Sequence, residues 1–283
     1  MGIRIRRARK HSKTHIVGFA LAGLLGFFAL GAIAVAFSMS NLVKEWLKEL
    51  PDYNSADAYI VAEPTRVYDA NGTEIVGYYL QNRRTVTADQ ISPYVFQGTV
   101  DTEDIRFYSH AGIDTQGIMR AVYVQLLGGS EGASTITQQL VRNTVLADEQ
   151  FDYSIARKVR EAYIAIQMEK KYTKDQILLM YLNTIYSGHG AYGIEAASIT
   201  YFNKHAADLT LSEAAALVAV PQAPSYFDPL VNPEACKDRR NLVLNRMYMA
   251  GDLTLEERDA AMAEELRDGI SEALEEFLMV SGA

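Results

Sequence analysis

The stretch Thr102-Glu103-Asp104-Ile105-Arg106-Phe107-Tyr108-Ser109-His110-Ala111-Gly112-Ile113-Asp114 crowds polar groups together. Two adjacent carboxylates are followed by an arginine, two aromatic rings and a histidine, and Gly112 then lets the chain turn. A helix that only packs against a core would instead show apolar residues at three- and four-residue spacing. Taken alone, the stretch fits an acidic, solvated helix start as well as it fits a catalytic carboxylate, because charge clusters usually face water.

The whole chain has the composition of a globular protein. It has 283 residues, of which 49% are hydrophobic, so one large or two small domains can each build a core. The single cysteine, Cys236, excludes an internal disulfide and any multi-cysteine metal site. The net charge is −8, although residues 1–14 carry six basic residues and no acid. The remainder is therefore strongly acidic, and nothing indicates nucleic acid as a partner.

An uncharged segment of 22 residues, 16–37, follows the basic stretch and predicts a membrane anchor. As a helix it would cross a hydrocarbon core of roughly 30 Å. A cleaved signal peptide is the alternative, because Ala32-Ile33-Ala34 has the small-residue spacing of a cleavage site, but its apolar region should span only about 7–15 residues. The basic flank orients the N-terminus to the cytoplasm and the rest of the chain to the outer side.

Beyond the anchor, the pattern predicts a mainly α fold with one small N-terminal β-hairpin. The β-rich runs 65–69 and 73–80 surround Asn71-Gly72, a dipeptide typical of hairpin turns. No convincing strand follows residue 90. In the helix 154–172, the expected buried stripe is Ile155, Val159, Ala162 and Ile166. Other helices are expected at 115–127 and 134–145, after capping boxes at Thr173, Thr210 and Thr254, and from Asn232-Pro233 to Gly251.

These patterns divide the chain into six segments. Residues 39–64 read as an interfacial segment and a linker, because Trp46 favours the membrane interface and Pro51 ends the pattern. The six segments are a cytoplasmic basic tail (1–15), the transmembrane anchor (16–38), the interfacial segment and linker (39–64), the hairpin (65–90), the main helical domain (91–250) and a C-terminal helical segment (251–283).

Three further stretches are more polar than packing helices need. Residues 132–143 place hydroxyl and amide groups at a glycine-led helix start, where backbone N–H groups favour anions such as phosphate. Ordinary capping by Ser134 or Thr135 is the structural alternative, and it leaves the polar residues after them unexplained. These are Gln138, Gln139, Arg142 and Asn143.

The second and third stretches are residues 157–161 and 181–194, and each has one structural alternative. Arg157, Lys158 and Glu161 share a helical face through three- and four-residue spacing, which alone would be a surface salt bridge. Residues 181–194 contain three glycines among aromatic and amide side chains, Asn183 and Tyr192 included. They indicate a helix that ends in a turn whose backbone closely approaches another group. A turn with a purely structural role is the alternative.

Taken in order, the four stretches resemble the motifs of the peptidoglycan glycosyltransferase domain, the lysozyme-like glycosyltransferase family 51. Glu213-Ala214-Ala215 and Pro221-Gln222-Ala223-Pro224 add a fifth motif, so the resemblance covers about residues 91–228. This domain occurs alone in monofunctional transglycosylases and at the front of class A penicillin-binding proteins. The hairpin is similar to the segment that precedes the domain in the latter.

The resemblance implies polymerisation of lipid II at the extracytoplasmic side of a bacterial cell membrane, by a single-pass protein. A lipid-linked glycan would be the donor, and the 4-hydroxyl of lipid II would displace undecaprenyl diphosphate with inversion. Glu103 would be the base, and Glu161 would lie near the leaving group with Arg157 and Lys158. No cofactor is required with certainty, a divalent cation (Mg²⁺ or Mn²⁺) stays open, and no protein metal site is predicted.

The resemblance also implies which residues bind substrate. Ser134, Gln139 and Arg142 would hold sugar and phosphate oxygens of the donor, and Asn183 and Tyr192 would line the cleft. The expected substrate-binding residues are Asp104, Ser134, Thr135, Gln138, Gln139, Arg142, Asn143, Arg157, Lys158, Asn183 and Tyr192. Three positions depart from the family: Arg142 replaces a frequent lysine, Ala133 replaces a frequent glycine, and the segment 144–153 has three acids and no basic residue.

The expected partners are lipid II, the lipid-linked donor and the bacterial membrane, with cell-wall assembly proteins as candidates. A penicillin-binding transpeptidase needs Ser-x-x-Lys and Lys-Thr-Gly motifs, and neither occurs, so no β-lactam binding is expected. Whether the chain is monofunctional or part of a class A protein stays open. Two alternatives to the polymerase remain: a non-catalytic cell-wall assembly scaffold, favoured by the acidic segment, and a lytic enzyme that cleaves peptidoglycan.

Overall fold

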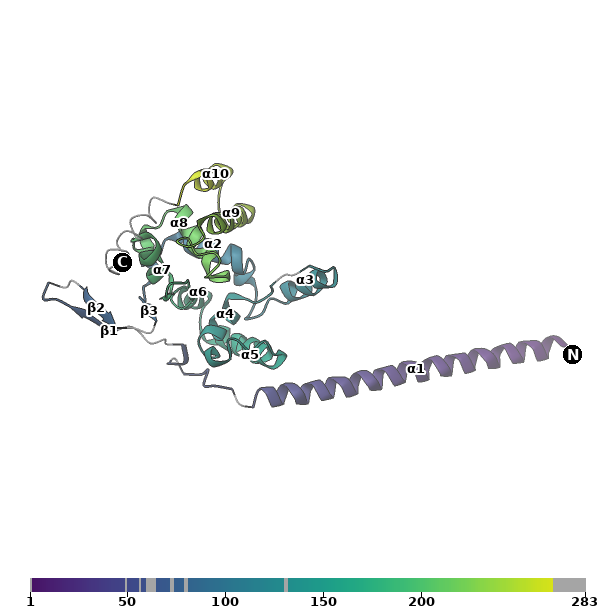
Figure 1. The fold of residues 1–283 in the computed structure, drawn as a ribbon. Coiled ribbons are helices and arrows are strands. Elements are labelled where there is room, and N and C mark those ends of the chain that lie inside the picture. The colour runs from purple at the N-terminus through teal and green to yellow at the C-terminus, as the bar shows by residue number, and fades with distance from the viewer. Residues whose placement is uncertain are drawn as a thin grey trace. The chain divides into compact units, whose positions relative to one another are not determined.

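The computed structural model describes residues 2–48, 50–55, 57–59, 65–71, 74–78, 81–129 and 132–266. Gly72 of the predicted turn and residues 267–283 of the predicted C-terminal segment lie outside this part of the chain. The described chain is mainly helical, as the sequence predicted (Figure 1). It forms two compact units, one of Met1–Leu50 with Ser154–Arg160 and one of Pro51–Tyr153 with Glu161–Ala283.

The first unit contains the long helix α1 (Gly2–Trp46). The helix continues unbroken from the predicted anchor through Asn41 to Trp46, and the interfacial position of this end stays a prediction. Its stretch Ala22–Trp46, 25 residues, is long and apolar enough to cross a membrane. Apolar side chains such as Phe27 and Leu30 are exposed along it, which fits a membrane anchor. A signal sequence shares this length and composition.

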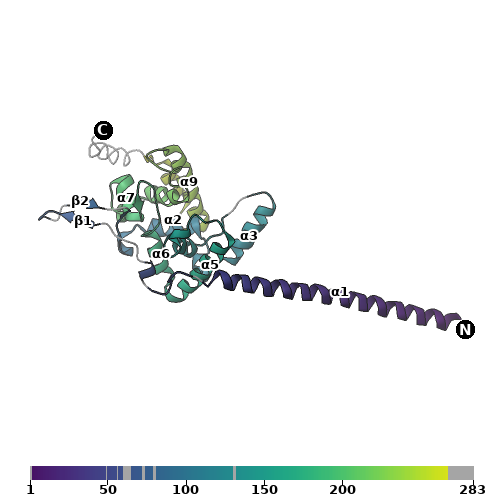
Figure 2. The same cartoon turned by 60° about the horizontal axis from the view of Figure 1, so that its bottom comes forward.

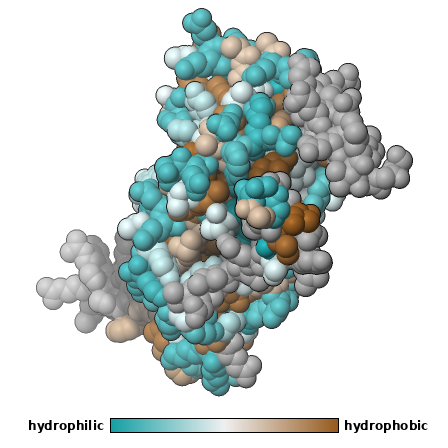
Figure 3. All heavy atoms as spheres, turned by 90° about the vertical axis from the view of Figure 1, so that its left-hand side faces the viewer, coloured by the Kyte–Doolittle hydropathy of each residue, from teal (hydrophilic) through white to brown (hydrophobic). Residues whose placement is uncertain are grey.

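The strands form two small sheets. β1 (Thr65–Tyr68) and β2 (Glu74–Tyr78) pair antiparallel, which confirms the hairpin. β3 (Asn82–Arg83) pairs parallel with β4 (Ala191–Tyr192), so the prediction that no strand follows residue 90 was wrong. Two-residue strands are too short to show the alternation by which a strand is recognised. The face in Figure 3 is largely hydrophilic, with apolar residues in small groups.

The helices of the chain after the hairpin begin and end close to the predicted positions. Thr173, Thr210 and Thr254 each accept a hydrogen bond from the backbone three residues on, as predicted for capping boxes. The helices are α2 (Pro93–Glu103), α3 (Thr115–Leu126), α4 (Ile136–Asn143), α5 (Ile155–Lys171), α6 (Lys174–Leu182), α7 (Ile194–Phe202), α8 (Leu211–Ala219), α9 (Pro233–Ala250) and α10 (Leu255–Ala263).

Helices α2, α8 and α9 pack together and hold the C-terminal end of α2 in place (Figures 1 and 2). Four buried alanines on α8 allow the close approach: Ala214, Ala215, Ala216 and Ala219. On α9, Arg240 is fully buried and donates to Ser212 Oγ at 3.0 Å and to the carbonyl oxygen of Glu264 at 2.7 Å. This arginine therefore ties α9 to α8 and to the end of α10.

The buried side of α5 differs from the predicted one. Ile155 is 74% exposed, whereas Glu161, Ile164, Ala165 and Met168 are buried. The turn at Gly112 explains the choice of face, since a Cβ added there would lie 2.7 Å from the backbone of Ala165. A loop that comes this close needs a small residue on the facing side of the helix. Ala165 provides it, although the same side also carries Glu161.

Candidate active site

Glu103 is the last residue of α2, and its carboxylate is held from α4. Gln139 Nε2 on α4 donates to Glu103 Oε2 at 2.9 Å. The hydroxyl of Tyr181, on α6, donates in turn to Gln139 Oε1 at 3.3 Å. Three helices that are distant in the sequence therefore meet at this glutamate.

Glu103 lies on the wall of a cleft of about 820 Å³. The expected site residues Asp104, Ser134, Thr135, Gln139 and Arg142 line the same cleft. The other lining residues are Asp101, Thr102, Ile105, Arg106, Asp114, Gly117, Arg120, Gly132, Ala133, Pro221, Gln222, Arg239, Arg246 and Met249. The cleft has the size of a small-molecule site, which typically measures about 300–1,000 Å³.

Asp104 connects the first motif to the second. Its buried carboxylate accepts from His110 Nε2 at 2.9 Å and from the backbone N–H of Ile136 at 3.1 Å. Ile136 is the first residue of α4, where negative charge is favoured by the helix dipole. The sequence analysis expected a substrate phosphate at this helix start. The structure shows that the protein's own Asp104 carboxylate occupies part of this position.

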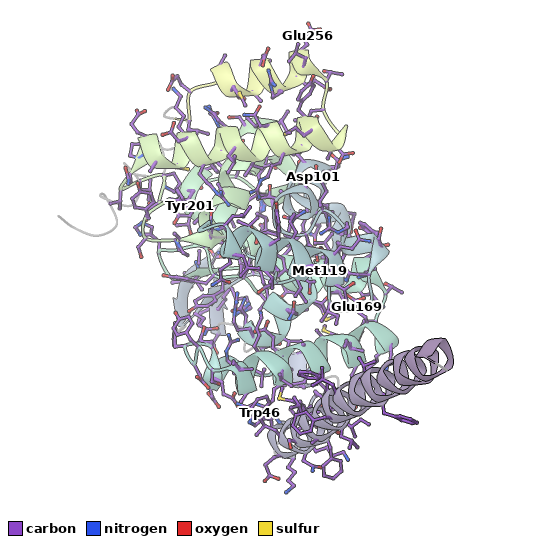
Figure 4. The ribbon with its side chains drawn as sticks, turned by 90° about the vertical axis from the view of Figure 1, so that its right-hand side faces the viewer. Trp46, Asp101, Met119, Glu169, Tyr201 and Glu256 are labelled. Carbon is purple, nitrogen blue, oxygen red and sulfur yellow. The ribbon has the colours of Figure 1, made fainter. Side chains whose placement is uncertain are left out.

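A polar cluster behind Asp104 was missed by sequence reasoning. Glu169 accepts from Thr137 Oγ1 at 2.6 Å and pairs with Lys174 at 2.7 Å (Glu169 is labelled in Figure 4). Lys174 Nζ also lies 3.4 Å from His110 Nδ1. The cluster joins the loop after α2 to α4, α5 and α6. Of its members, only His110 belongs to the stretch 102–114 in which the sequence predicted the site.

Thr135 and Gln138 form the capping box of α4. The N–H of Gln138 donates to Thr135 Oγ1 at 3.1 Å, and the N–H of Thr135 donates to Gln138 Oε1 at 3.1 Å. Both side chains are buried. Capping therefore accounts for both residues, which is the structural alternative stated for Thr135. Asn143 is the last residue of the helix and does not line the cleft.

Asn183 and Tyr192 make structural contacts of their own within the domain. Asn183 exchanges two hydrogen bonds of 3.0 Å with the backbone of Val86, so its amide ties α6 to the segment before α2. The ring of Tyr192 stacks against Tyr186 at 4.8 Å between centroids and carries the Arg83 guanidinium at 5.1 Å. Neither residue is among those that line the cleft.

The glycine-rich turn after α6 approaches the protein's own atoms. A Cβ at Gly188 would lie 2.5 Å from the Tyr201 hydroxyl, and a Cβ at Gly193 would lie 2.7 Å from the Asn183 carbonyl oxygen. Both glycines have positive φ angles of 85°. The structural alternative thus accounts for Gly188 and Gly193, whereas a Cβ at Gly190 would meet no atom within 4 Å.

Glu161 is completely buried on α5 and is not among the residues that line the cleft. Arg157 and Lys158 precede it by one turn of the same helix, in the stretch Ser154–Arg160 that groups with α1. Among the described residues, no group of three or more His, Cys, Asp or Glu side chains is arranged to hold a metal ion.

Four of the five arginines that line the cleft were not predicted as site residues: Arg106, Arg120, Arg239 and Arg246. Arg106 forms a double hydrogen bond with Asp114 and lowers the pKa of that carboxyl. Burial, followed by the charge of Arg246, lowers the pKa of Arg239. Arg239 and Arg246 are seven residues apart on α9 and so share a face, a spacing from which they could have been found.

Asp101 lies two residues before Glu103 and also lines the cleft (labelled in Figure 4). It is 8% exposed, and its Oδ2 atom has no hydrogen-bond partner in the described structure. Burial, followed by the charge of the neighbouring Asp252, raises the pKa of Asp101 to about 7. This acid therefore changes charge near neutral pH.

The Transglycosylase family matches residues 70–248 of the chain. Penicillin-binding protein 1F of Bacillus subtilis is 43% identical over 209 residues, which cover 73% of this chain and 29% of that protein. Penicillin-binding protein 1A of Escherichia coli is 43% identical over 231 residues, 81% of this chain and 27% of that protein. This chain thus spans roughly 30% of such relatives.

A crystal structure of penicillin-binding protein 1A from Haemophilus influenzae is similar with a TM-score of 0.43 and 25% identity, covering 73% of this chain and 21% of that one. The family match includes the cleft-lining residues of α2, α4 and α9 up to Arg246, and with them Glu103 and Gln139. The chain belongs to the transglycosylase family, the peptidoglycan glycosyltransferases whose motifs its sequence carries.

Proposed function

We propose that the protein is a membrane-anchored peptidoglycan glycosyltransferase that polymerises lipid II and releases undecaprenyl diphosphate. One observation carries the proposal: the Glu103 carboxylate lies on the wall of a cleft of about 820 Å³ that five arginines also line. A base and a group of cations in one cleft meet the two needs of this reaction. The hydroxyl must lose a proton, and the diphosphate must leave with its charge stabilised.

In the proposed reaction, Glu103 removes the proton of the acceptor 4-hydroxyl. The hydroxyl oxygen bonds to the anomeric carbon of the donor as the bond from that carbon to the diphosphate oxygen breaks. One displacement inverts the anomeric configuration, and the proton stays on Glu103 until solvent accepts it. Gln139 supports this role, because its N–H holds one carboxylate oxygen at 2.9 Å and thereby fixes the side chain.

The arginines of the cleft are proposed to bind the phosphates of donor and acceptor. Guanidinium groups bind phosphate through paired hydrogen bonds, so Arg142 in place of the family's frequent lysine keeps this capacity. Ser134 lines the same cleft and is the proposed contact to donor oxygens. Arg239 and Arg246 extend the cationic lining on the α9 side, beyond the residues that the motifs assigned.

The proposed role of Glu161 at the leaving group stays a prediction, as does a divalent cation beside it. A buried carboxylate is stable only with compensating partners, so Glu161 acts in this proposal together with Arg157 and Lys158 on its helix. Polymerisation measured with Mg²⁺, with Mn²⁺ and with a chelator tests the cation. Glu161→Gln tests the acid.

A lipid substrate at the outer face of the membrane is supported by α3. This helix lines the cleft with Gly117 and Arg120, and it exposes Met119 (74%) and Leu126 (81%) on its surface (Met119 is labelled in Figure 4). Ile118, Val122, Tyr123 and Leu127 are also exposed. Contiguous apolar patches mark membrane or protein contacts. These exposed residues of α3 support a cleft that opens at a membrane surface. The basic N-terminus and the apolar span of α1 separately support an anchored chain.

The decisive experiment is an assay of lipid II polymerisation by the full chain in detergent or liposomes. Glu103→Gln keeps the shape of the side chain and removes the base, so the rate should fall by roughly 10²–10⁴-fold with an unchanged circular dichroism spectrum. Retained activity of this variant would refute the role of Glu103. Lipid II that stays monomeric with the wild type would refute the function.

The acidic segment 144–153 favours a second candidate, a non-catalytic scaffold. Asp148 and Asp152 are exposed there, and they would repel a phosphate-bearing donor. A scaffold would leave lipid II unchanged in the assay above. A lytic enzyme would release soluble fragments from purified peptidoglycan, which a polymerase does not.

A further inference from the structure

Tyr181 belongs to a chain of hydrogen bonds that ends on Glu103. Its hydroxyl lies 3.3 Å from Gln139 Oε1, and Gln139 Nε2 lies 2.9 Å from Glu103 Oε2. The chain runs from α6 through α4 to the last residue of α2. Within the described part of the chain, Gln139 is the only side chain that donates a hydrogen bond to the Glu103 carboxylate.

The chemistry of the groups fixes the direction of this chain. An ionised carboxylate only accepts hydrogen bonds, so the amide of Gln139 must turn its N–H toward Glu103. Its carbonyl oxygen is then left to accept from the Tyr181 hydroxyl. Burial, with the charge of Glu103 next, raises the pKa of Tyr181 well above its usual value, so this hydroxyl keeps the proton that it donates to Gln139 Oε1.

Tyr181 is placed to act through Gln139 and not on a substrate. It is 3% exposed and does not line the large cleft. It borders a cavity of about 20 Å³ behind Glu103, together with Val95 and Leu217. A space of this size holds about one water molecule and no sugar.

We propose that Tyr181 is a positioning residue for glycosyl transfer, which holds the Gln139 amide so that the Glu103 carboxylate keeps one orientation toward the cleft. The inference rests on the proposed function and adds a residue to it. A base must stand within hydrogen-bond reach of the hydroxyl it deprotonates, so a carboxylate that rotates freely is in place for only part of the time. Gln139 alone, without a donor on its carbonyl oxygen, can rotate away.

Charged groups near Glu103 come from several elements of the described chain. Arg142 on α4 and Arg239 and Arg246 on α9 line the same cleft, as do Asp101 and Asp104 beside Glu103 in the chain. None of them is removed by a change at Tyr181. A loss of rate in Tyr181→Phe would therefore report the lost donor and not a changed set of charges.

Tyr181→Phe is the test variant, and Tyr201→Phe is its matched control. Both changes remove a buried tyrosine hydroxyl, but Tyr201 donates to the carbonyl oxygen of Ser187 at 2.7 Å and is not part of the chain of hydrogen bonds that ends on Glu103. With lipid II as substrate, Tyr181→Phe should lower kcat about five- to tenfold at unchanged KM. Tyr201→Phe should leave kcat and KM unchanged.

A double variant tests whether Tyr181 acts through Gln139. Gln139→Met removes both amide groups, and Tyr181→Phe should then cost less than about twofold further, because residues in one chain are not additive. Full kcat in Tyr181→Phe, or an equal loss in Tyr201→Phe, would overturn the inference while an inactive Glu103→Gln keeps the proposed function. A wild type that does not polymerise lipid II refutes the function itself, so the two failures are distinct.

Discussion

Asp101→Asn should stabilise the protein above neutral pH and leave its stability near pH 4 almost unchanged. Asp101 is buried at the end of α2, faces Asp252, and has one carboxylate oxygen without a hydrogen-bond partner. Burial and then the Asp252 charge raise its pKa from 3.8 to about 7. Asparagine keeps the shape, carries no charge, and can donate a hydrogen bond to Asp252.

The sign follows from proton binding in the two states. Between pH 4 and pH 7 the folded protein keeps a proton on Asp101 that the unfolded chain has lost, so the folding stability falls as pH rises through this window. A pKa of about 7 in place of 3.8 corresponds to about 4 kcal/mol. Relaxation of the partly open pair lowers this, and we expect roughly 2–4 kcal/mol of stabilisation in Asp101→Asn at pH 8.

The measurement is urea unfolding of the full chain in detergent micelles, followed by circular dichroism at pH 4 and pH 8. Asp148→Asn removes an exposed carboxylate and serves as the control, with an expected change below about 0.5 kcal/mol at both pH values. Two results would refute the reasoning: an Asp101→Asn variant that is less stable than the wild type at pH 8, or a difference that is equal at both pH values.

Two other predictions concern the packing that positions the site. Arg240→Met removes a buried guanidinium and leaves Ser212 Oγ and the Glu264 carbonyl oxygen without this donor, so unfolding should become easier by about 3–5 kcal/mol in the same urea titration; a loss below about 1 kcal/mol would contradict this. Gly112→Ala should cost far more than Gly190→Ala. Both glycines have positive φ, but only at Gly112 does a Cβ meet backbone, at 2.7 Å, whereas at Gly190 nothing lies within 4 Å. Equal melting temperatures of the two variants would show that the close approach carries no cost.

Local signals in the sequence predicted most of the helices, and ordered motifs predicted the family. A capping box at Thr210, a proline at the start of α9 and Gly251 after its end are local signals, because they involve groups within one helical turn. The apolar span could be read from its length without charge. Glu103 was predicted as the base from ordered motifs, and that role stays a prediction. None of these depends on which segments pack against which. Such features can therefore be predicted from the sequence without knowledge of the fold.

Which side chains meet in the site depends on how distant segments of the chain pack. Asp104 takes the N–H of Ile136, 32 residues away, and Arg239 comes beside Glu103 from the far end of the domain. The buried side of α5 contains Glu161 and not the predicted Ile155, because it depends on what packs against that helix. Periodicity gives the faces of a helix but not their partners, because the partners come from other segments of the chain. The residues beside the predicted base, Tyr181 among them, are set by that packing.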